Sequence, residues 1–206
     1  MPRRYVMQQR AKAHDATRRR IVDAAIEVRS GRRDRTLTAV AARADVSRLT
    51  VYRHFPDEAA LAKACMTRFI EIHPPPDPSG WAAIEPAPAR LRRGLADLYA
   101  WYGDNEAMLT NSAVDQFADP AVAEALAPVT ADFEAMHRTL AAGWSDGGGG
   151  RSLIDAAIDH AMAFTTWLSL RRGQGLSDVE TVTLMVSLVE TADAPYLTRS
   201  QSPQRG

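Results

Sequence analysis

Residues 39–61 read AVAARADVSRLTVYRHFPDEAAL, two short helical patterns separated by a tight turn. Before the turn, Thr36 can cap a helix over residues 37–44 whose apolar side chains share one face. After the turn, Ser47 can cap a second helix. Pro56 ends it, because the residue before a proline is pushed out of helical geometry. The stretch therefore predicts a helix, a turn and a helix, and no strand.

The second helix has an apolar side and a polar side. Val51 and Phe55 are four residues apart and point the same way, so the polar side chains between them face elsewhere. In a helix-turn-helix, the second helix lies in the major groove of DNA, and its N-terminal residues reach the base edges. The arginine fork suits guanine, while hydroxyl, phenol and imidazole groups suit thymine or phosphate. The candidate DNA contacts are Thr36, Thr38, Ser47, Arg48, Leu49, Thr50, Tyr52, Arg53 and His54.

The charge distribution supports a nucleic-acid partner. The formal net charge of the 206 residues is zero, but residues 1–70 hold 16 Lys and Arg against 7 Asp and Glu, and residues 71–206 hold 9 against 18. A basic module joined to an acidic one is typical of a nucleic-acid binder that carries a second domain. Solvated charge without a partner is the alternative interpretation.

Residues 39–61 resemble the DNA-binding signature of the TetR (tetracycline-repressor) family of bacterial regulators, and the similarity covers about residues 16–66. The positions that carry it are Val40, Ala41, Ala44, Val46, Ser47, Tyr52, His54, Phe55 and Leu61. The resemblance implies an all-α homodimer with a small N-terminal domain on DNA and a larger ligand-binding domain. It also implies that the last two helices form a four-helix dimer interface.

Three positions depart from the family pattern. Glu58 stands where a lysine commonly meets DNA phosphate, Leu49 where a small residue is common, and Arg32 where an aromatic residue is common. A basic arm could compensate by following the DNA backbone or entering a minor groove, with a disordered tail as the alternative. Its basic residues are Arg3, Arg4, Arg10 and Lys12.

Helical periodicity continues through the rest of the chain, and no segment alternates as a strand does, so we predict an all-α fold. Residues 1–56 form the basic arm and the helix-turn-helix domain, a three-helix unit. The resemblance implies that residues 57–206 form a helical domain that binds an effector and dimerises, in which residues 57–72 are expected to be a connecting helix. The further helices are expected from residue 15 or 17 to 31, at 91–103, at 120–142 with a bend or break at Pro128, at 152–171 and at 178–191.

The last two helices are apolar around most of their girth, which favours burial on more than one side. A homodimer provides the second side, and burial within one subunit is the alternative. The residues assigned to the dimer interface are Ile154, Ile158, Leu168, Val182, Val186 and Val189.

An effector pocket is expected among aromatic and methionine side chains of the second domain, and it suits a mostly apolar or aromatic small molecule. Trp167, Phe164 and His160 share one row of the expected helix, so the histidine could supply an orienting polar contact. The candidate ligand contacts are Trp101, Phe117, Phe133, Met136, His137, His160, Phe164 and Trp167.

These patterns predict a DNA-binding transcriptional regulator. The resemblance to the TetR family implies that it responds to a ligand, and we expect a repressor that binds a palindromic operator as a homodimer and is released by its effector. No set of residues at catalytic or metal-ligand spacing is present, so neither a metal nor a cofactor is expected. No signal peptide or apolar span is found, which predicts a cytoplasmic protein. The alternatives are an all-helical enzyme and a dimeric scaffold without DNA binding, for which Glu58 is the only hint.

Overall fold

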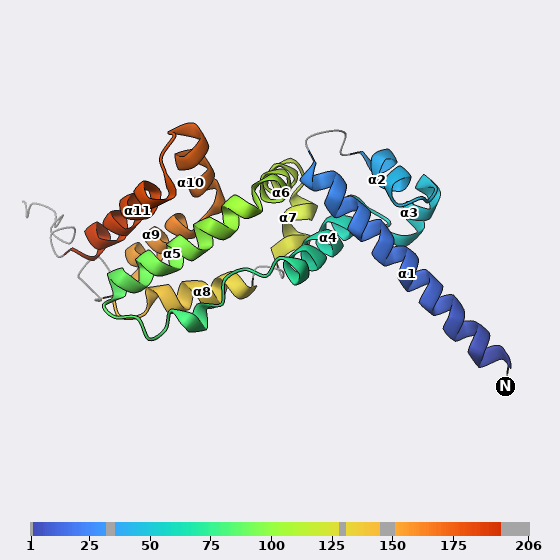
Figure 1. The fold of residues 1–206 in the computed structure, drawn as a ribbon, viewed down its shortest axis with the longest axis horizontal. Coiled ribbons are helices and arrows are strands. Elements are labelled where there is room, and N and C mark those ends of the chain that lie inside the picture. Colours follow the sequence, from blue (N-terminus) through green and yellow to red (C-terminus); the bar gives the residue numbers. More distant parts are fainter. Residues whose placement is uncertain (1, 32–35, 128–130, 145–150, 195–206) are drawn as a thin grey trace, which may run out of the picture. The chain divides into compact units, whose positions relative to one another are not determined.

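The computed structural model describes residues 2–31, 36–127, 131–144 and 151–194. Every regular element in these ranges is helical, which confirms the all-α prediction (Figure 1). The chain divides into two compact units that are interleaved in sequence. The first unit holds Met1–Pro74 and Asn105–Thr130, and the second holds Pro75–Asp104 and Ala131–Gly206.

The first unit is built around α1, which packs against α2, α4 and α6, while α4 packs against α7. Its core contains Ile21, Ala25, Leu61, Cys65 and Phe69, each at most 3% exposed. The helices of this unit are α1 (Pro2–Ser30), α2 (Leu37–Arg43), α3 (Arg48–His54), α4 (Glu58–Ile72), α6 (Glu106–Ala118) and α7 (Pro120–Leu126).

The helix starts around the turn are fixed by side-chain caps. The Thr36 hydroxyl accepts from the Ala39 amide at 3.2 Å, and Ser47 Oγ accepts from the Thr50 amide at 3.1 Å. Asp57 Oδ1 accepts from the Ala60 amide at 2.7 Å. Each cap satisfies an amide that the first helical turn leaves without a partner. The starts of α2 and α3 therefore confirm the expected caps, and Asp57 caps α4 at its expected start.

The start of α1 was predicted wrongly. The helix begins at Pro2, not at Asp15 or Thr17. Thr17 lies within it and its hydroxyl donates to the Ala13 carbonyl at 2.9 Å, a bond that a mid-helix threonine makes in place of a cap. The described backbone of the basic arm is thus helical, and Arg10 and Lys12 are exposed on it, while the side chains of Arg3 and Arg4 lie outside the described ones.

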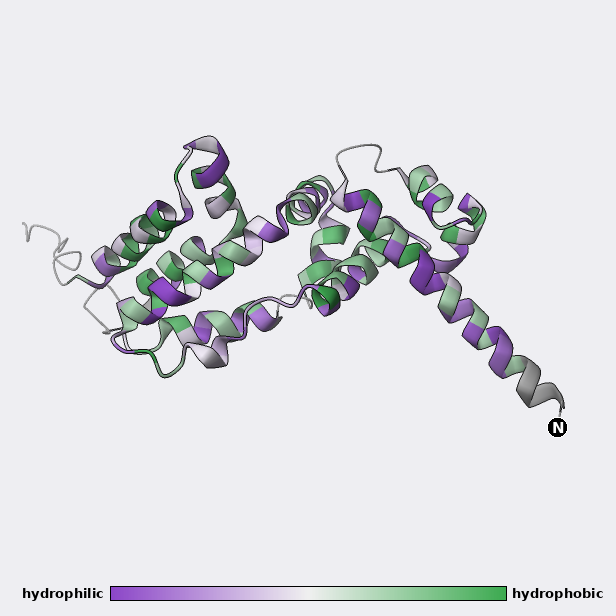
Figure 2. Ribbon diagram, viewed as in Figure 1, coloured by the Kyte–Doolittle hydropathy of each residue, from purple (hydrophilic) through white to green (hydrophobic). Residues whose placement is uncertain are grey.

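The second unit packs α11 against α5 and α9, and α8 against α5 and α9. Hydrophobic and hydrophilic residues alternate along these helices (Figure 2), and most of their buried residues are hydrophobic. Leu91, Leu95, Leu140, Ile158 and Val186 are completely buried there. The elements are a 3-10 turn η1 (Pro78–Gly80), α5 (Ala87–Asp104), α8 (Ala131–Ala141), α9 (Arg151–Met162), α10 (Phe164–Leu168), a π-helical turn η3 (Ser169–Gly173) and α11 (Asp178–Asp193).

Two expected helices are divided. The segment 120–142 forms α7 and α8, and residues 128–130, with the expected break at Pro128, lie outside the described residues. The segment 152–171 forms α9, α10 and η3, because Ala163 has an extended conformation with ψ of 129°. Two further elements were not expected: α6, and the η1 turn inside the proline-rich connector.

The two compact units do not divide between residues 56 and 57, where the sequence predicted a functional boundary. α4 packs against α1, so the expected connecting helix belongs to the same compact unit as the helix-turn-helix. α6 and α7 also join this unit, although they follow α5 in the sequence. The division into residues 1–56 and 57–206 remains a prediction about function.

Most residues assigned to the dimer interface are core residues of one chain. Five of them are at most 5% exposed: Ile154, Ile158, Val182, Val186 and Val189. Leu168 is half-buried. α11 packs against α5 and α9 within the second unit, so the interpretation of burial within one subunit holds for the five buried side chains. The exposed apolar residues of the two helices are Leu153, Val179, Leu184 and Leu188.

Candidate nucleic-acid interface

The turn between α2 and α3 is held by backbone hydrogen bonds. The Ala44 amide donates to the Val40 carbonyl at 2.9 Å, and the Val46 amide donates to the Ala41 carbonyl at 3.0 Å. Between them Asp45 adopts a left-handed conformation with φ of 52°, which aspartate tolerates better than most residues. The turn therefore reverses the chain and sets the direction of α3.

Two apolar anchors fix α3 against the rest of the first unit. Val51 and Phe55 are 1% and 2% exposed. The Arg18 guanidinium of α1 lies 4.5 Å from the centre of the Phe55 ring, a cation–π contact at the C-terminal end of α3. The anchors hold one side of α3 inside, so the opposite side is available to a partner.

The outward side of α3 carries four of the nine candidate contacts. Arg48, Leu49, Tyr52 and Arg53 are exposed, and so is Thr38 on α2. Arginine, tyrosine and threonine supply donors for phosphates and base edges, and Leu49 supplies an apolar contact of the kind that suits a thymine methyl group.

The hydroxyl candidates at the helix starts are already used locally. Ser47 Oγ lies 2.9 Å from Thr50 Oγ1, in addition to its bond from the Thr50 amide. Thr50 is half-buried, and Thr36 caps α2. These three side chains position the two helices, and any contact they make with DNA is additional to that role.

His54 lies differently from the other candidates. It is half-buried, and its ring centre is 4.3 Å from that of His14 on α1. Its Nδ1 is buried and has no hydrogen-bond partner among the described residues. Burial, and then the charges of His14, Arg18 and Arg53, lower the pKa of His54 from its usual value. The free protein therefore holds this imidazole neutral near pH 7.

Glu58 occupies the first turn of α4 and is exposed next to its Asp57 cap. Carboxylates stabilise the positive end of the helix, but they repel a DNA phosphate at the same place. This end of α4 therefore does not offer the attraction that a lysine would provide.

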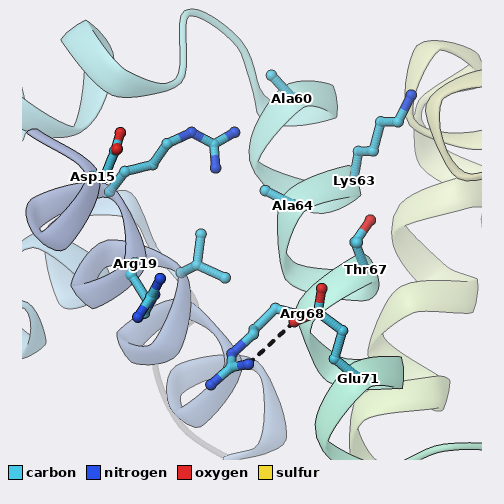
Figure 3. Close-up of a pocket in the computed structure, with 10 residues that line it drawn as sticks. Asp15, Arg19, Ala60, Lys63, Ala64, Thr67, Arg68 and Glu71 are labelled. Atoms are coloured by element: carbon cyan, nitrogen blue, oxygen red, sulfur yellow. Dashed lines mark hydrogen bonds and ion pairs between the residues drawn. The ribbon is translucent and has the colours of Figure 1, made fainter. Parts of the chain in front are cut away.

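A groove of about 730 Å³ runs between α1 and α4 in the same unit (Figure 3). Arg18 and Arg19 of α1 and Lys63 of α4 line it, with Val22, Ala60 and Ala64 as its apolar part. Arg68 also lines the groove and is held by Asp23 at 3.4 Å and Glu71 at 3.1 Å. The lining mixes both signs of charge, so it adds only weakly to the positive surface of α1.

Four of the ligand candidates lie together in the second unit. Ring centres are 6.2 Å apart between Trp101 and Phe133 and 5.6 Å apart between Phe164 and Trp167. Tyr102, which was not a candidate, joins the two pairs, at 5.7 Å from Trp101 and 5.8 Å from Trp167. The sequence pattern gave no signal for this tyrosine beyond its place near the end of the helix expected at 91–103.

The other four ligand candidates are placed differently from the aromatic cluster. Met136 is completely buried, and Phe117 belongs to the first unit, where it is 84% exposed. His137 Nε2 lies 3.4 Å from an Asp159 oxygen. His160 is exposed, with Nδ1 3.3 Å from Thr166 Oγ1. The expected row of His160, Phe164 and Trp167 does not exist, because the helix is interrupted at Ala163.

The break at Ala163 gives the cluster fixed polar bonds. The Tyr99 hydroxyl donates to the Ala161 carbonyl at 2.7 Å, and the Tyr102 hydroxyl donates to the Met162 carbonyl at 2.5 Å. The Trp167 indole donates to Asp178 at 3.2 Å. Burial raises the pKa of both tyrosines, which keeps the phenols protonated as donors.

Comparisons with known proteins bear on the first unit and on the fold. Residues 21–65 match the family model of bacterial regulatory proteins of the tetR family. A Clostridium perfringens protein described as a fatty acid metabolism regulator superposes with a TM-score of 0.57 at 16% identity, over 83% of this chain and 97% of its own. A Mesorhizobium loti protein described as a TetR-family transcriptional regulator superposes with a TM-score of 0.58 at 16% identity, over 87% of this chain and 96% of its own. No curated protein matches the chain.

An all-α chain with an exposed polar recognition helix after a capped turn is a helix-turn-helix DNA-binding protein. The match at residues 21–65, together with the all-α fold, supports a transcriptional regulator of the TetR family. This family suggests a protein that is not an enzyme.

Among the described residues, no helix combines the length and apolar character needed to cross a membrane. The same residues contain no group of three or more side chains suited to a metal ion.

Proposed function

We propose that the protein is a repressor that binds a palindromic operator as a homodimer and leaves it when a small, mostly apolar or aromatic effector binds. The observation that carries the proposal is the outward polar side of α3 opposite the buried Val51 and Phe55. Two such helices on a twofold axis reach successive major grooves about 34 Å apart, which requires two related half-sites. Arg48 reads a base, and Tyr52 and Arg53 bind phosphates.

The dimer interface is proposed on the exposed leucines of α9 and α11. Leu184 and Leu188 are 46% and 41% exposed and lie four residues apart on one side of α11. Leu153 of α9 is also exposed at 41%. Apolar side chains of this size, repeated on one helix side, lose contact with water when a second copy covers them.

The interface is tested by light scattering on the variant Leu184→Asp with Leu188→Asp. Buried aspartates without partners oppose association, so the variant is expected to be monomeric where the parent protein is dimeric. The matched control is Val114→Asp with Phe117→Asp, which changes two exposed apolar residues of α6. Dissociation by the control pair and not by the leucine pair would move the interface to α6.

The effector site is proposed at the aromatic cluster of Trp101, Phe133, Phe164, Trp167 and Tyr102. Aromatic walls with a few fixed polar groups are the usual composition of a small-molecule site. Residues 57–206 would then hold the effector and the dimer contacts, and residues 1–56 would hold DNA. We also place the protein in the cytoplasm, where its operator is.

Coupling between effector and operator is supported by contacts inside the first unit. Arg29 at the end of α1 forms an ion pair with Asp115 of α6, and Asn111 of α6 donates to the Arg29 carbonyl. α4 packs against α7. A shift of α6 and α7 therefore reaches both α1 and α4. A coupling free energy of about 1–3 kcal/mol is enough to change operator affinity roughly 5- to 150-fold.

The DNA-binding test is a gel-shift titration with the DNA that flanks the protein's own gene, repeated at several salt concentrations. Sequence-selective binding that weakens as salt rises supports the regulator, because phosphate contacts release counterions. Equal affinity for unrelated DNA, or no binding at low salt, would refute the proposal and favour a scaffold. The variant Arg92→Ala, an exposed position of α5, controls for the loss of one positive charge.

A further inference from the structure

His14 of α1 and His54 at the end of α3 form a close pair of tilted rings. Their ring centres are 4.3 Å apart and the ring planes are inclined at 38°. His14 is exposed, whereas His54 is half-buried with its Nδ1 inaccessible and without a described hydrogen-bond partner. An imidazole in this position loses solvation and gains no acceptor for a second proton.

The charged neighbours of the pair are mostly positive. Arg18 of α1 and Arg53 of α3 both act on His54, and each disfavours its protonated form. Asp15 is the carboxylate beside the pair, 3.6 Å from His14 Nδ1. α2 packs against α3, but its one charged residue, Arg43, is ion-paired with Glu27 of α1. In the free protein, few negatively charged groups therefore lie near His54 to stabilise its protonated form.

A DNA phosphate near the end of α3 reverses this balance. Its negative charge attracts the protonated imidazole, and it also screens the charges of Arg18 and Arg53. His54 thus binds a proton more tightly in the complex than in the free protein. The argument rests on the proposed placement of α3 in the major groove, with His54 beside a phosphate.

We propose that DNA binding takes up a proton at the His14–His54 pair, so that the affinity for DNA rises as the pH falls. The sign follows from linkage, because the state that binds more protons is favoured at lower pH. The pH dependence is expected between two pKa values of His54. The pKa in the free protein lies below the ordinary histidine value of about 6.5, and the pKa in the complex lies above it. Below and above this window both states carry the same number of protons, and the dependence disappears.

His14 is a positioning residue in this arrangement. Its ring covers His54 and, when charged, repels it. Its removal exposes His54 to water, which raises the pKa of His54 in the free protein. The His14→Gln variant should therefore take up less than a full proton, although His54 is unchanged.

The test measures the Kd of a fluorescent mixed-sequence duplex by anisotropy over roughly pH 6 to 8 at about 50 mM salt, with the full-length protein. A mixed sequence suffices, because phosphate contacts do not depend on base identity. Binding heats in two buffers of different ionisation enthalpy count the protons independently. The variants are His54→Gln and His14→Gln, with His73→Gln, an exposed histidine at the C-terminal end of α4, as the matched control.

The parent protein and the control are expected to bind more tightly as pH falls, by at least about threefold and at most about tenfold per pH unit in the window. His54→Gln should show less than about half of that change, with His14→Gln in between. Tight binding with an equal pH dependence in His54→Gln and the parent would overturn the inference and leave the DNA-binding function intact. No duplex binding by the parent at any pH would instead refute the proposed function.

Discussion

Arg29 and Asp115 form an ion pair that joins the last turn of α1 to α6, and their side chains are 17% and 30% exposed. A second ion pair of α1, between Glu27 and Arg43 of α2, has side chains that are 53% and 60% exposed. The two pairs differ in solvation and provide a direct comparison within one unit.

Asp115→Asn should destabilise the protein by about 1–3 kcal/mol, because Arg29 keeps its charge in a partly desolvated place without its partner. Glu27→Gln should cost about 0–1 kcal/mol, since water screens the exposed pair. Urea unfolding monitored by circular dichroism measures both. A larger loss for Glu27→Gln would contradict the assignment of the α1–α6 contact as the stronger link.

Arg48→Ala should weaken binding to the operator by about 1–3 kcal/mol and relax the choice of base, because the guanidinium fork is expected to read a guanine. Arg53→Ala should weaken all sequences alike and reduce the salt dependence of binding, because a phosphate contact carries no sequence information. Titrations against the operator and a scrambled duplex separate the two effects. Identical changes in both variants would count against the assigned orientation of α3.

Cys65 should resist alkylation in the folded protein. Burial raises the pKa of its thiol to about 12, so very little of the reactive thiolate is present near neutral pH. Iodoacetamide labelling followed by mass spectrometry should be slow in buffer and fast in denaturant. Rapid labelling in buffer would show that the packing of α1 and α4 around Cys65 opens readily.

Gly94 and Gly103 of α5 should respond oppositely to alanine. A Cβ at Gly94 would lie 2.5 Å from the Leu140 Cδ2 atom and 3.3 Å from Trp81, so Gly94→Ala overpacks the contact between α5 and α8 and should cost about 1–3 kcal/mol. A Cβ at Gly103 would meet Trp167 at 3.9 Å, an ordinary contact. Gly103→Ala should therefore stabilise the helix by up to about 1 kcal/mol. Thermal unfolding of the two variants measures the difference, and stabilisation by both would contradict the close packing.

The features that could be predicted from the sequence depend on neighbouring residues. Thr36, Ser47 and Asp57 cap their helices through bonds to amides three residues away, so local sequence was enough to place the starts of α2, α3 and α4. Thr17 shows the limit of the same rule. Its hydroxyl can bond backward to Ala13 inside a helix, and only the structure distinguishes this from a cap.

Other features depend on contacts distant in sequence. Ala163 interrupts a helix although neither proline nor glycine is present there, and the carbonyls of Ala161 and Met162 are satisfied by tyrosines about 60 residues earlier. α11 is apolar on several sides as expected, but it packs against α5 and α9, which leaves Val182, Val186 and Val189 buried and Leu184 and Leu188 exposed. Periodicity indicates that a face is buried and does not indicate which element buries it.

The length of α1 has a consequence for the extent of bound DNA. The helix has 29 residues, and residues 7–16 are exposed along it. At about 1.5 Å per residue, those ten residues reach roughly 15 Å, close to the rise of four or five base pairs. A rigid rod that carries Arg10 and Lys12 can lie over backbone outside the bases read by α3. The DNA protected from nuclease should therefore extend beyond the bases read by α3. Deletion of the N-terminal part of α1 should shorten the protected DNA to those bases.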